Sequence, residues 1–173
     1  MPKEYAEPRK EGEALEIRDA RPAEYERIGK ILVAAYSAVD PELGGYADDL
    51  RDVAARAAAA EVLVAAERAD PVGTVTYVPG PGPYAEWEDP DAAGIRMLAV
   101  DPEWQGRGLG AALVRACIER AQAAGRARIR LHTTDLMAAA QHMYERLGFL
   151  RTSENDWEPA PGFWLRAYRL DLG

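Results

Sequence analysis

Three glycines lie close together at the start of a predicted helix. Gly106, Gly108 and Gly110 fall within five residues, and the apolar residues that follow are spaced as on one helix face. Glycine lets the backbone approach a ligand closely, and it costs conformational entropy to hold in place. A glycine cluster at a helix N-terminus typically forms a nest of N–H groups that binds an anion. The sequence therefore predicts an anion site at this helix.

Two well-known phosphate loops fit these glycines poorly. A P-loop needs a lysine and then a serine or threonine after its last glycine, and Ala111 and Ala112 stand there instead. A dinucleotide-binding turn follows its strand directly and needs an acidic residue about twenty positions on. Here "DPEWQ" separates the glycines from the preceding strand, and Asp135 lies too far away. The sequence argues against both.

Two sequence blocks point to a third kind of anion site. "MLAVDPEWQGRGLGAALV" contains a strand, a loop of the form Gln/Arg-x-x-Gly-x-Gly/Ala that begins at Gln105, and an amphipathic helix; "MYERLGF" follows. In their order and separation, these blocks resemble those of the GNAT family, the acetyl-CoA-dependent N-acetyltransferases. The likeness covers roughly residues 14–173 and is sharp between Gly94 and Phe149. It implies the α/β (α+β) GNAT fold, a mixed, mostly antiparallel sheet of six or seven strands with helices on both faces.

The resemblance also implies a function. The chain would be an acyltransferase that moves the acetyl group of acetyl-CoA to a primary amine of a small molecule or protein. The coenzyme A pyrophosphate would bind the N–H groups of the glycine loop and the positive end of the following helix. The expected cofactor-binding residues are Leu98, Ala99, Val100, Gln105, Gly106, Arg107, Gly108, Leu109, Gly110, Ala111 and Tyr144. The alternative is a non-catalytic acyl-CoA-binding sensor or interaction domain.

Tyr144 stands where the family's usual tyrosine acid stands, four residues before Gly148. A phenol with a pKa of ~10 can donate a proton to a leaving thiolate whose conjugate acid has a pKa of ~8.5. Ala140, Met143, Tyr144 and Leu147 also share helical spacing, so packing is the alternative role. With the family pattern, we expect Tyr144 to be the general acid.

The general base is less clear from the sequence. Many relatives place a glutamate at the start of the central strand, where this chain has Gly94. The nearest carboxylates are those of Glu86, Glu88, Asp89 and Asp91 in the preceding loop. We take Glu86 and Glu88 as candidate bases; the alternative for each of the four is a solvated charge.

A second departure from the family pattern concerns the contact with pantetheine. Many relatives carry an asparagine seven residues before the tyrosine, and Met137 stands there in this chain. Thr133, Thr134 or Asp135 could replace its contact, or nothing replaces it.

Other chemically distinctive residues have simpler interpretations. Cys117 lies on the apolar stripe of a helix and is expected to be a core thiol. Trp164 is expected in a strand core, whereas Trp87 and Trp157 fall in Pro/Asp-rich segments and could line an acceptor pocket. The two histidines, His132 and His142, fit no metal-ligand spacing, so no metal is expected.

The elements that must position these residues alternate between strand and helix. Strands are expected near residues 14–20, 61–67, 71–78, 94–100, 127–133 and 162–172, and helices near residues 22–39, 46–59, 109–125 and 136–147. The Pro/Gly-rich and acidic stretch at residues 79–93 is long for a loop in a compact domain, and such loops are often functional. The alternative is a tolerated insertion at a hairpin tip.

Composition excludes several classes. The chain has 173 residues, one cysteine and a formal net charge of −8. That charge argues against nucleic acid as a partner and mildly favours a cationic amine. No apolar run approaches a membrane span, and the mixed-charge start is unlike a signal peptide. We expect a flexible tail over residues 1–13, a single domain over 14–173 and a cytoplasmic protein; a homodimer is possible, as in other members of this family.

Overall fold

The computed structural model describes residues 15–173, and the predicted tail at residues 1–13 lies outside them. The strands are β1 (Glu16–Asp19), β2 (Glu61–Glu67), β3 (Asp70–Val78), β4 (Ala92–Val100), β5 (Arg128–Thr133), β6 (Leu150–Arg151), β7 (Trp157–Ala160) and β8 (Phe163–Asp171). The helices are α1 (Tyr25–Val39), α2 (Tyr46–Arg51), α3 (Val53–Ala59), α4 (Leu109–Ala123) and α5 (Ala138–Arg146). Three short 3-10 turns complete the described elements, of which η2 (Pro102–Trp104) and η3 (Ser153–Asn155) flank the site described below.

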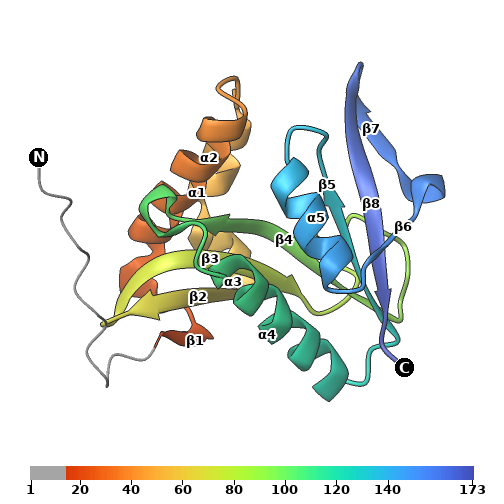
Figure 1. Ribbon diagram of the computed structural model, residues 1–173, viewed down its shortest axis with the longest axis horizontal. Helices are drawn as coiled ribbons and strands as arrows, with labels where there is room; N and C mark the ends of the chain where they lie inside the picture. Colours follow the sequence, from red (N-terminus) through yellow and green to blue (C-terminus); the bar gives the residue numbers. More distant parts are fainter. Residues whose placement is uncertain (1–14) are drawn as a thin grey trace, which may run out of the picture.

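One twisted sheet organises the described residues (Figure 1). Its strand order is β1-β2-β3-β4-β5-β8-β6, and β7 pairs with β8 at one end. All of these pairs are antiparallel except β4 with β5. The mixed, mostly antiparallel sheet is confirmed. Over residues 15–173 it has eight strands, more than the six or seven expected. The short strands β6 and β7 were not expected, because two and four residues leave no alternating pattern in the sequence.

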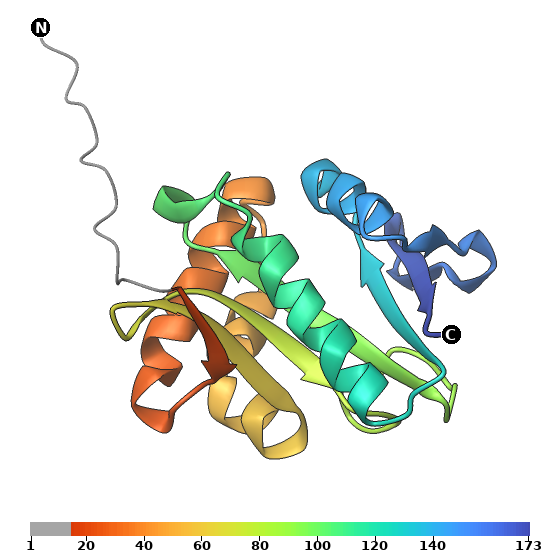
Figure 2. The same cartoon turned by 60° about the horizontal axis from the view of Figure 1, so that its bottom comes forward.

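Helices cover both faces of the sheet, as predicted (Figure 2). On one face, Leu113 and Cys117 of α4 pack with Leu131 of β5 and with α5. On the other face, residues of α1, α2 and α3 pack on β2 and on the end of β4; these include Ile28, Ile31, Leu32, Leu50 and Val53. None of the described helices is long and apolar enough to cross a membrane.

The single helix expected over residues 46–59 is wrong. Asp52 interrupts it with ψ of 63°, and its carboxylate accepts a hydrogen bond from the N–H of Ala55. Aspartate competes with the helix backbone in this way and is favoured at N-caps, so the alanine-rich segment is divided into α2 and α3.

The most consequential irregularity lies in β4. Met97 has a φ of 52°, in the left-handed region, and the β3–β4 register shifts between Thr74 and Thr76. β4 pairs with β5 only from Ala92 to Ile95, and the rest of β4 has no strand partner on that side. A bulge of this kind bends a strand and increases its twist. The two central strands therefore separate after Ile95, which opens the sheet beside residues 96–100.

Candidate active site

The glycine loop presents a row of unpaired N–H groups. Gly106 and Gly108 have φ values of 78° and 79°, and a Cβ added at either would meet no atom within 4 Å. These glycines are therefore required by backbone conformation, not by crowding. Gly108 is the N-cap of α4 and provides no side-chain cap. The N–H groups of residues 105–111 have no hydrogen-bond partner among the described residues, so they and the helix dipole form a site for an anion.

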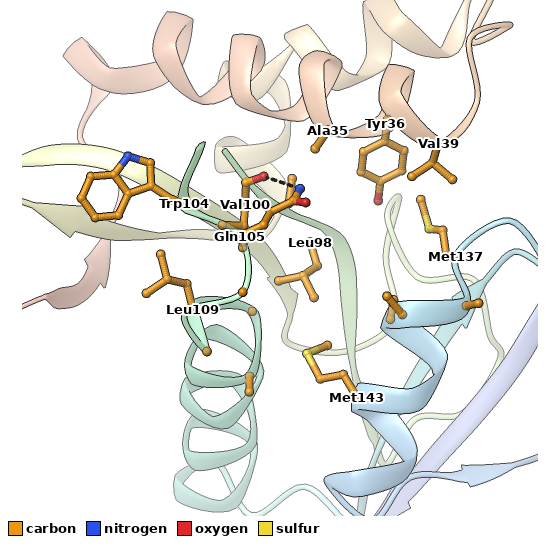
Figure 3. A pocket seen from close by; sticks show the side chains of 18 of the residues that line it. Ala35, Tyr36, Val39, Leu98, Val100, Trp104, Gln105, Leu109, Met137 and Met143 are labelled. Atoms are coloured by element: carbon orange, nitrogen blue, oxygen red, sulfur yellow. Dashed lines mark hydrogen bonds between the residues drawn. The ribbon is translucent and has the colours of Figure 1, made fainter. Parts of the chain in front are cut away.

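A pocket of about 490 Å³ extends from this loop along the open edge of β4 (Figure 3). Nine of the eleven residues expected to bind the cofactor line it: Leu98, Ala99, Val100, Gln105, Gly106, Gly108, Leu109, Gly110 and Ala111. Arg107 and Tyr144 do not. The Arg107 guanidinium lies 4.4 Å from the ring centre of Trp104, in a cation–π arrangement.

The edge of β4 offers the pocket a row of backbone groups. The Ala99 carbonyl faces β3, since it lies 3.3 Å from the position of a Cβ at Gly73. Backbone groups of adjacent strand residues point in opposite directions, so those of Leu98 and Val100 face the pocket. The Val100 carbonyl does so, because it accepts a hydrogen bond from Nε2 of Gln105 at 3.2 Å (Figure 3). An extended ligand can pair with this edge as a further strand would.

The opposite wall comes from α1 and α5. Tyr36 and Val39 project from α1, and Met137, Met143 and Arg146 come from the start and body of α5. Of these residues, the sequence pattern singles out only Met137, at the position of the family's asparagine. Arg146 is exposed and forms no ion pair with another described residue, so it adds a positive charge beside the pocket. Its position within "MYERLGF" was the available signal.

Tyr144 is buried beneath this wall. Its ring packs edge-on against Phe149, with centroids 5.5 Å apart, and lies 6.3 Å from Tyr168. Burial, with a smaller contribution from the Cys117 thiol, raises the pKa of Tyr144 above its ordinary value. Its hydroxyl forms no hydrogen bond with any described residue. The phenol is therefore protonated at neutral pH, and in this structure it is a weaker acid than a free phenol.

Tyr36 is a second phenol, directly in the pocket wall (Figure 3). Burial raises its pKa well above the ordinary value; Tyr46, Tyr144 and Glu86 add to this effect, and Arg96 opposes it.

Gly94 is explained by a tryptophan from the β3–β4 loop. A Cβ at Gly94 would lie 1.7 Å from Cη2 of Trp87, so the indole ring occupies the space above this residue. The loop of residues 79–91 is therefore folded back onto β4 and is not a free hairpin tip. Gly94, which stands in place of the family's glutamate, therefore leaves the space that the Trp87 ring occupies.

The same fold-back places Glu86 beside the opening of the sheet. Its two carboxylate oxygens lie 2.7 Å from Nε of Arg96 and 2.9 Å from Nδ1 of His132. Glu88 is exposed and lines a separate hollow of about 250 Å³ with Glu86 and His132. The candidate base Glu86 is thus positioned by β4 and β5, whereas Glu88 is not held by any described ion pair.

The remaining loop carboxylates have structural partners or are solvated. Asp89 accepts hydrogen bonds from Arg128 and Arg130 of β5 at 2.8 and 3.0 Å. Burial alone would raise the pKa of Asp89, but these two arginines and the Asp91 N–H lower it. Asp91 is exposed, and its backbone N–H donates a hydrogen bond to the Asp89 carboxylate at 3.1 Å. Asp89 therefore fastens the loop to β5.

Met137, at the position of the family's asparagine, and its possible replacements Asp135 and Thr133 have different surroundings. Met137 lines the pocket. Asp135 is paired with Arg166 at 2.9 Å and so has its partner within the protein. The hydroxyl of Thr133 is buried without a hydrogen-bond partner among the described residues, so it retains its capacity to bind a ligand or a water molecule.

Two expectations about tryptophans have different outcomes. Trp164 is 41% exposed, so its assignment to a strand core is wrong; β8 extends beyond the sheet there and pairs only with the short β7. Trp157 is also exposed, and its ring lies edge-on to His132 with centroids 6.4 Å apart.

Cys117 is buried, as expected, and burial raises the pKa of its thiol to about 12, so it is not a nucleophile.

Comparisons with known proteins agree with this geometry. The model of the acetyltransferase (GNAT) family matches residues 25–149. The chain is 38% identical over 68 residues to a mycothiol acetyltransferase from Gordonia bronchialis, and 36% identical over 75 residues to an N-acetylaspartate synthetase from Danio rerio. These matches cover 39% and 43% of this chain but only 22% and 27% of the relatives' lengths.

A solved structure supports the same fold. The structure of yncA from Salmonella typhimurium, with its cofactor acetyl-CoA, matches with a TM-score of 0.67 and 21% sequence identity. The match covers 92% of this chain and 95% of that chain, so the similarity extends over nearly all the described elements.

The packing of Trp87 on Gly94 can be tested by Gly94→Ala. The added methyl group would overlap the indole ring, so we expect the free energy of unfolding to fall by about 1–3 kcal/mol, as for other overpacked sites. Urea denaturation measures this loss. The control is Gly82→Ala in the same loop, where a Cβ meets nothing within 4 Å. Equal stability of the two variants would contradict the proposed packing.

Proposed function

The chain belongs to the GNAT family of acetyltransferases, and from this premise we propose that it transfers the acetyl group of acetyl-CoA to a primary amine. The observation that carries the proposal is the row of unpaired N–H groups at residues 105–111, which opens into a pocket beside a free strand edge. We further propose that residues 14–173 act as one domain, because the residues assigned to the cofactor, the base and the acid come from elements spread over this range.

The pocket fits acetyl-CoA in its chemistry. The unpaired N–H groups at the α4 N-terminus would hold the pyrophosphate, with Arg146 as an additional cation beside them. The backbone groups of Leu98 and Val100 would pair with the amides of the pantetheine arm. Acetyl-CoA supplies the thioester carbonyl that an amine attacks. A related fold with acetyl-CoA as its cofactor supports this assignment.

The amine must be neutral before it can attack. An alkylamine with a pKa of ~10.4 is mostly protonated at pH 7, which costs about 4–5 kcal/mol unless the site removes the proton. We assign this role to Glu86, directly or through a water molecule, because Arg96 and His132 hold its carboxylate at the opening of the sheet. Glu88 is the second candidate, since it is free of ion pairs and shares a hollow with Glu86.

The leaving thiolate must receive a proton. We assign this proton to Tyr144, because it stands where the family's tyrosine acid stands and its hydroxyl has no hydrogen-bond partner among the described residues. Tyr36 is the competing donor, because it lines the pocket directly. We also propose a cytoplasmic setting, which the single buried cysteine supports.

The test of function is thioester turnover against a panel of amines, measured as free thiol. Turnover with one amine class supports the enzyme and identifies its substrate class. Tight acetyl-CoA binding without turnover of any amine would favour the non-catalytic binding domain instead.

The anion site is tested by Gly108→Asp. Aspartate there adds bulk and a negative charge, so acetyl-CoA binding should be lost. The parent's melting temperature should rise with acetyl-CoA, as expected for about 2.7 kcal/mol of stabilisation at 100 times Kd, and that of Gly108→Asp should not. Gly125→Asp is the matched control, because Gly125 is also left-handed, with φ of 69°, and lies beyond the far end of α4. It should retain the rise.

The proton donor is tested by Tyr144→Phe and Tyr36→Phe. If Tyr144 is the acid, its phenylalanine variant should lose about 10²–10⁴ in kcat while acetyl-CoA binding is retained. Steady-state kinetics and the acetyl-CoA-induced rise in melting temperature measure the two quantities separately. Full activity of Tyr144→Phe with loss in Tyr36→Phe would transfer the role to Tyr36.

The base is tested by Glu86→Gln and Glu88→Gln. Loss of a base lowers kcat and reshapes the pH profile, whereas loss of a carboxylate that only binds the cationic amine raises KM and leaves the profile alone. We expect the first result for Glu86→Gln and at most the second for Glu88→Gln. Parent-like rates and pH profiles in both would exclude the two glutamates.

A further inference from the structure

His132 joins three segments that are distant in the sequence. It lies on β5, and its side chain is only 6% exposed. Its Nδ1 lies 2.9 Å from an oxygen of Glu86 in the β3–β4 loop, and its Nε2 lies 3.1 Å from the carbonyl oxygen of Asn155 in η3. Its ring meets Trp157 of β7 edge-on. One imidazole thus connects the loop, the central sheet and the start of the β7–β8 hairpin.

The two groups beside the imidazole, the Glu86 carboxylate and the Asn155 carbonyl, accept hydrogen bonds and do not donate them. A neutral histidine carries one N–H and could serve only one of them, whereas the imidazolium carries two. The contact between Nδ1 and Glu86 is close but is not a well-aligned hydrogen bond, so its attraction depends on charge. A protonated ring suits both neighbours, because it brings an N–H to the Asn155 carbonyl and a positive charge to Glu86.

The surrounding charges support this protonation state. Burial alone would lower the pKa of His132, but Glu86, the Asn155 carbonyl and Asp156 together raise it above its ordinary value. Two cations lie nearby: Arg96 shares the Glu86 carboxylate with His132, binding its other oxygen, and Arg130 of the same strand pairs with Asp89 and donates to the Asn155 side chain. The β8 residue opposite His132 is Ala167, which has no charge.

We propose that the His132 imidazolium is a positioning residue that holds Glu86 at the opening of the sheet and ties the β3–β4 loop to η3. This inference rests on the proposed role of Glu86 in acetyl transfer. Arg96 and His132 bind opposite oxygens of the carboxylate, so together they set its orientation, and the loop cannot move without breaking one of these contacts. His132 itself touches neither the pocket beside the glycine loop nor the reacting atoms.

The first test does not depend on activity. The chain has two histidines, so His142→Gln assigns the imidazole ¹⁵N signals to His132. Both nitrogens of His132 should carry protons at about pH 6.5, near the ordinary histidine pKa. In Glu86→Gln, His132 should lose its proton at a lower pH than in the parent. Loss at the same pH in both proteins would overturn the proposal, whether or not the enzyme acetylates an amine.

The second test is a double-mutant cycle. His132→Gln retains a donor for the Asn155 carbonyl but has no charge for Glu86, so kcat should fall about tenfold, as for loss of a charge-assisted contact, with KM for acetyl-CoA unchanged. Combined with Glu86→Gln, it should cause no further loss, because both changes remove one function. The control is the exposed His142→Gln, which should match the parent. Parent-like kcat in His132→Gln, or additive losses in the double variant, would overturn the positioning role.

Discussion

The separation of β4 from β5 is the constraint on which the site depends. The two strands are paired from Ala92 to Ile95 and then part, because the bulge at Met97 turns the end of β4 away. A continuous sheet would have used the backbone groups of Leu98 and Val100 in its own ladder. The backbone strain at Met97 is tolerated because its side chain is buried against α1–α3. The packing of Met97 against α1–α3 thus helps to keep the edge of β4 open beside the pocket.

The β3–β4 loop completes the site from the opposite direction. A stretch rich in proline, glycine and acidic residues would be expected to remain solvated, yet three contacts fasten it to the sheet. Trp87 covers Gly94, Asp89 binds two arginines of β5, and Glu86 lies between Arg96 and His132. The absence of a side chain on β4 makes room for the indole ring, and the indole ring places the neighbouring glutamate. A carboxylate near the opening is therefore obtained from a loop and not from the strand.

The sequence predicted the parts of the fold that local pattern determines. The glycine loop, the strands at residues 61–67 and 94–100 and the helix from Leu109 are close to where periodicity placed them. The division of α2 from α3 was missed because a single capping aspartate outweighed a helical pattern of alanines. The contribution of Tyr36 to the pocket could not be predicted, because it depends on how α1 lies across the sheet and not on the spacing of its residues. Arg146 was missed although it stands within "MYERLGF". His132 was considered only as a metal ligand, since its partners lie 46 and 23 residues away along the chain.

An acidic chain that is to bind a dianion must do so through groups that its own carboxylates cannot neutralise. Many of its arginines lie in ion pairs, as Arg128 does with Asp89 and Arg151 does with Asp156, so their charges are locally cancelled. Backbone N–H groups carry partial charges that neither titrate nor pair with a nearby side chain when the loop conformation keeps them free. The left-handed glycines at 106 and 108 provide that conformation, and the α4 dipole adds to the same field. The glycine cluster is therefore the means by which a protein with a net charge of −8 can present a positive site to an anion.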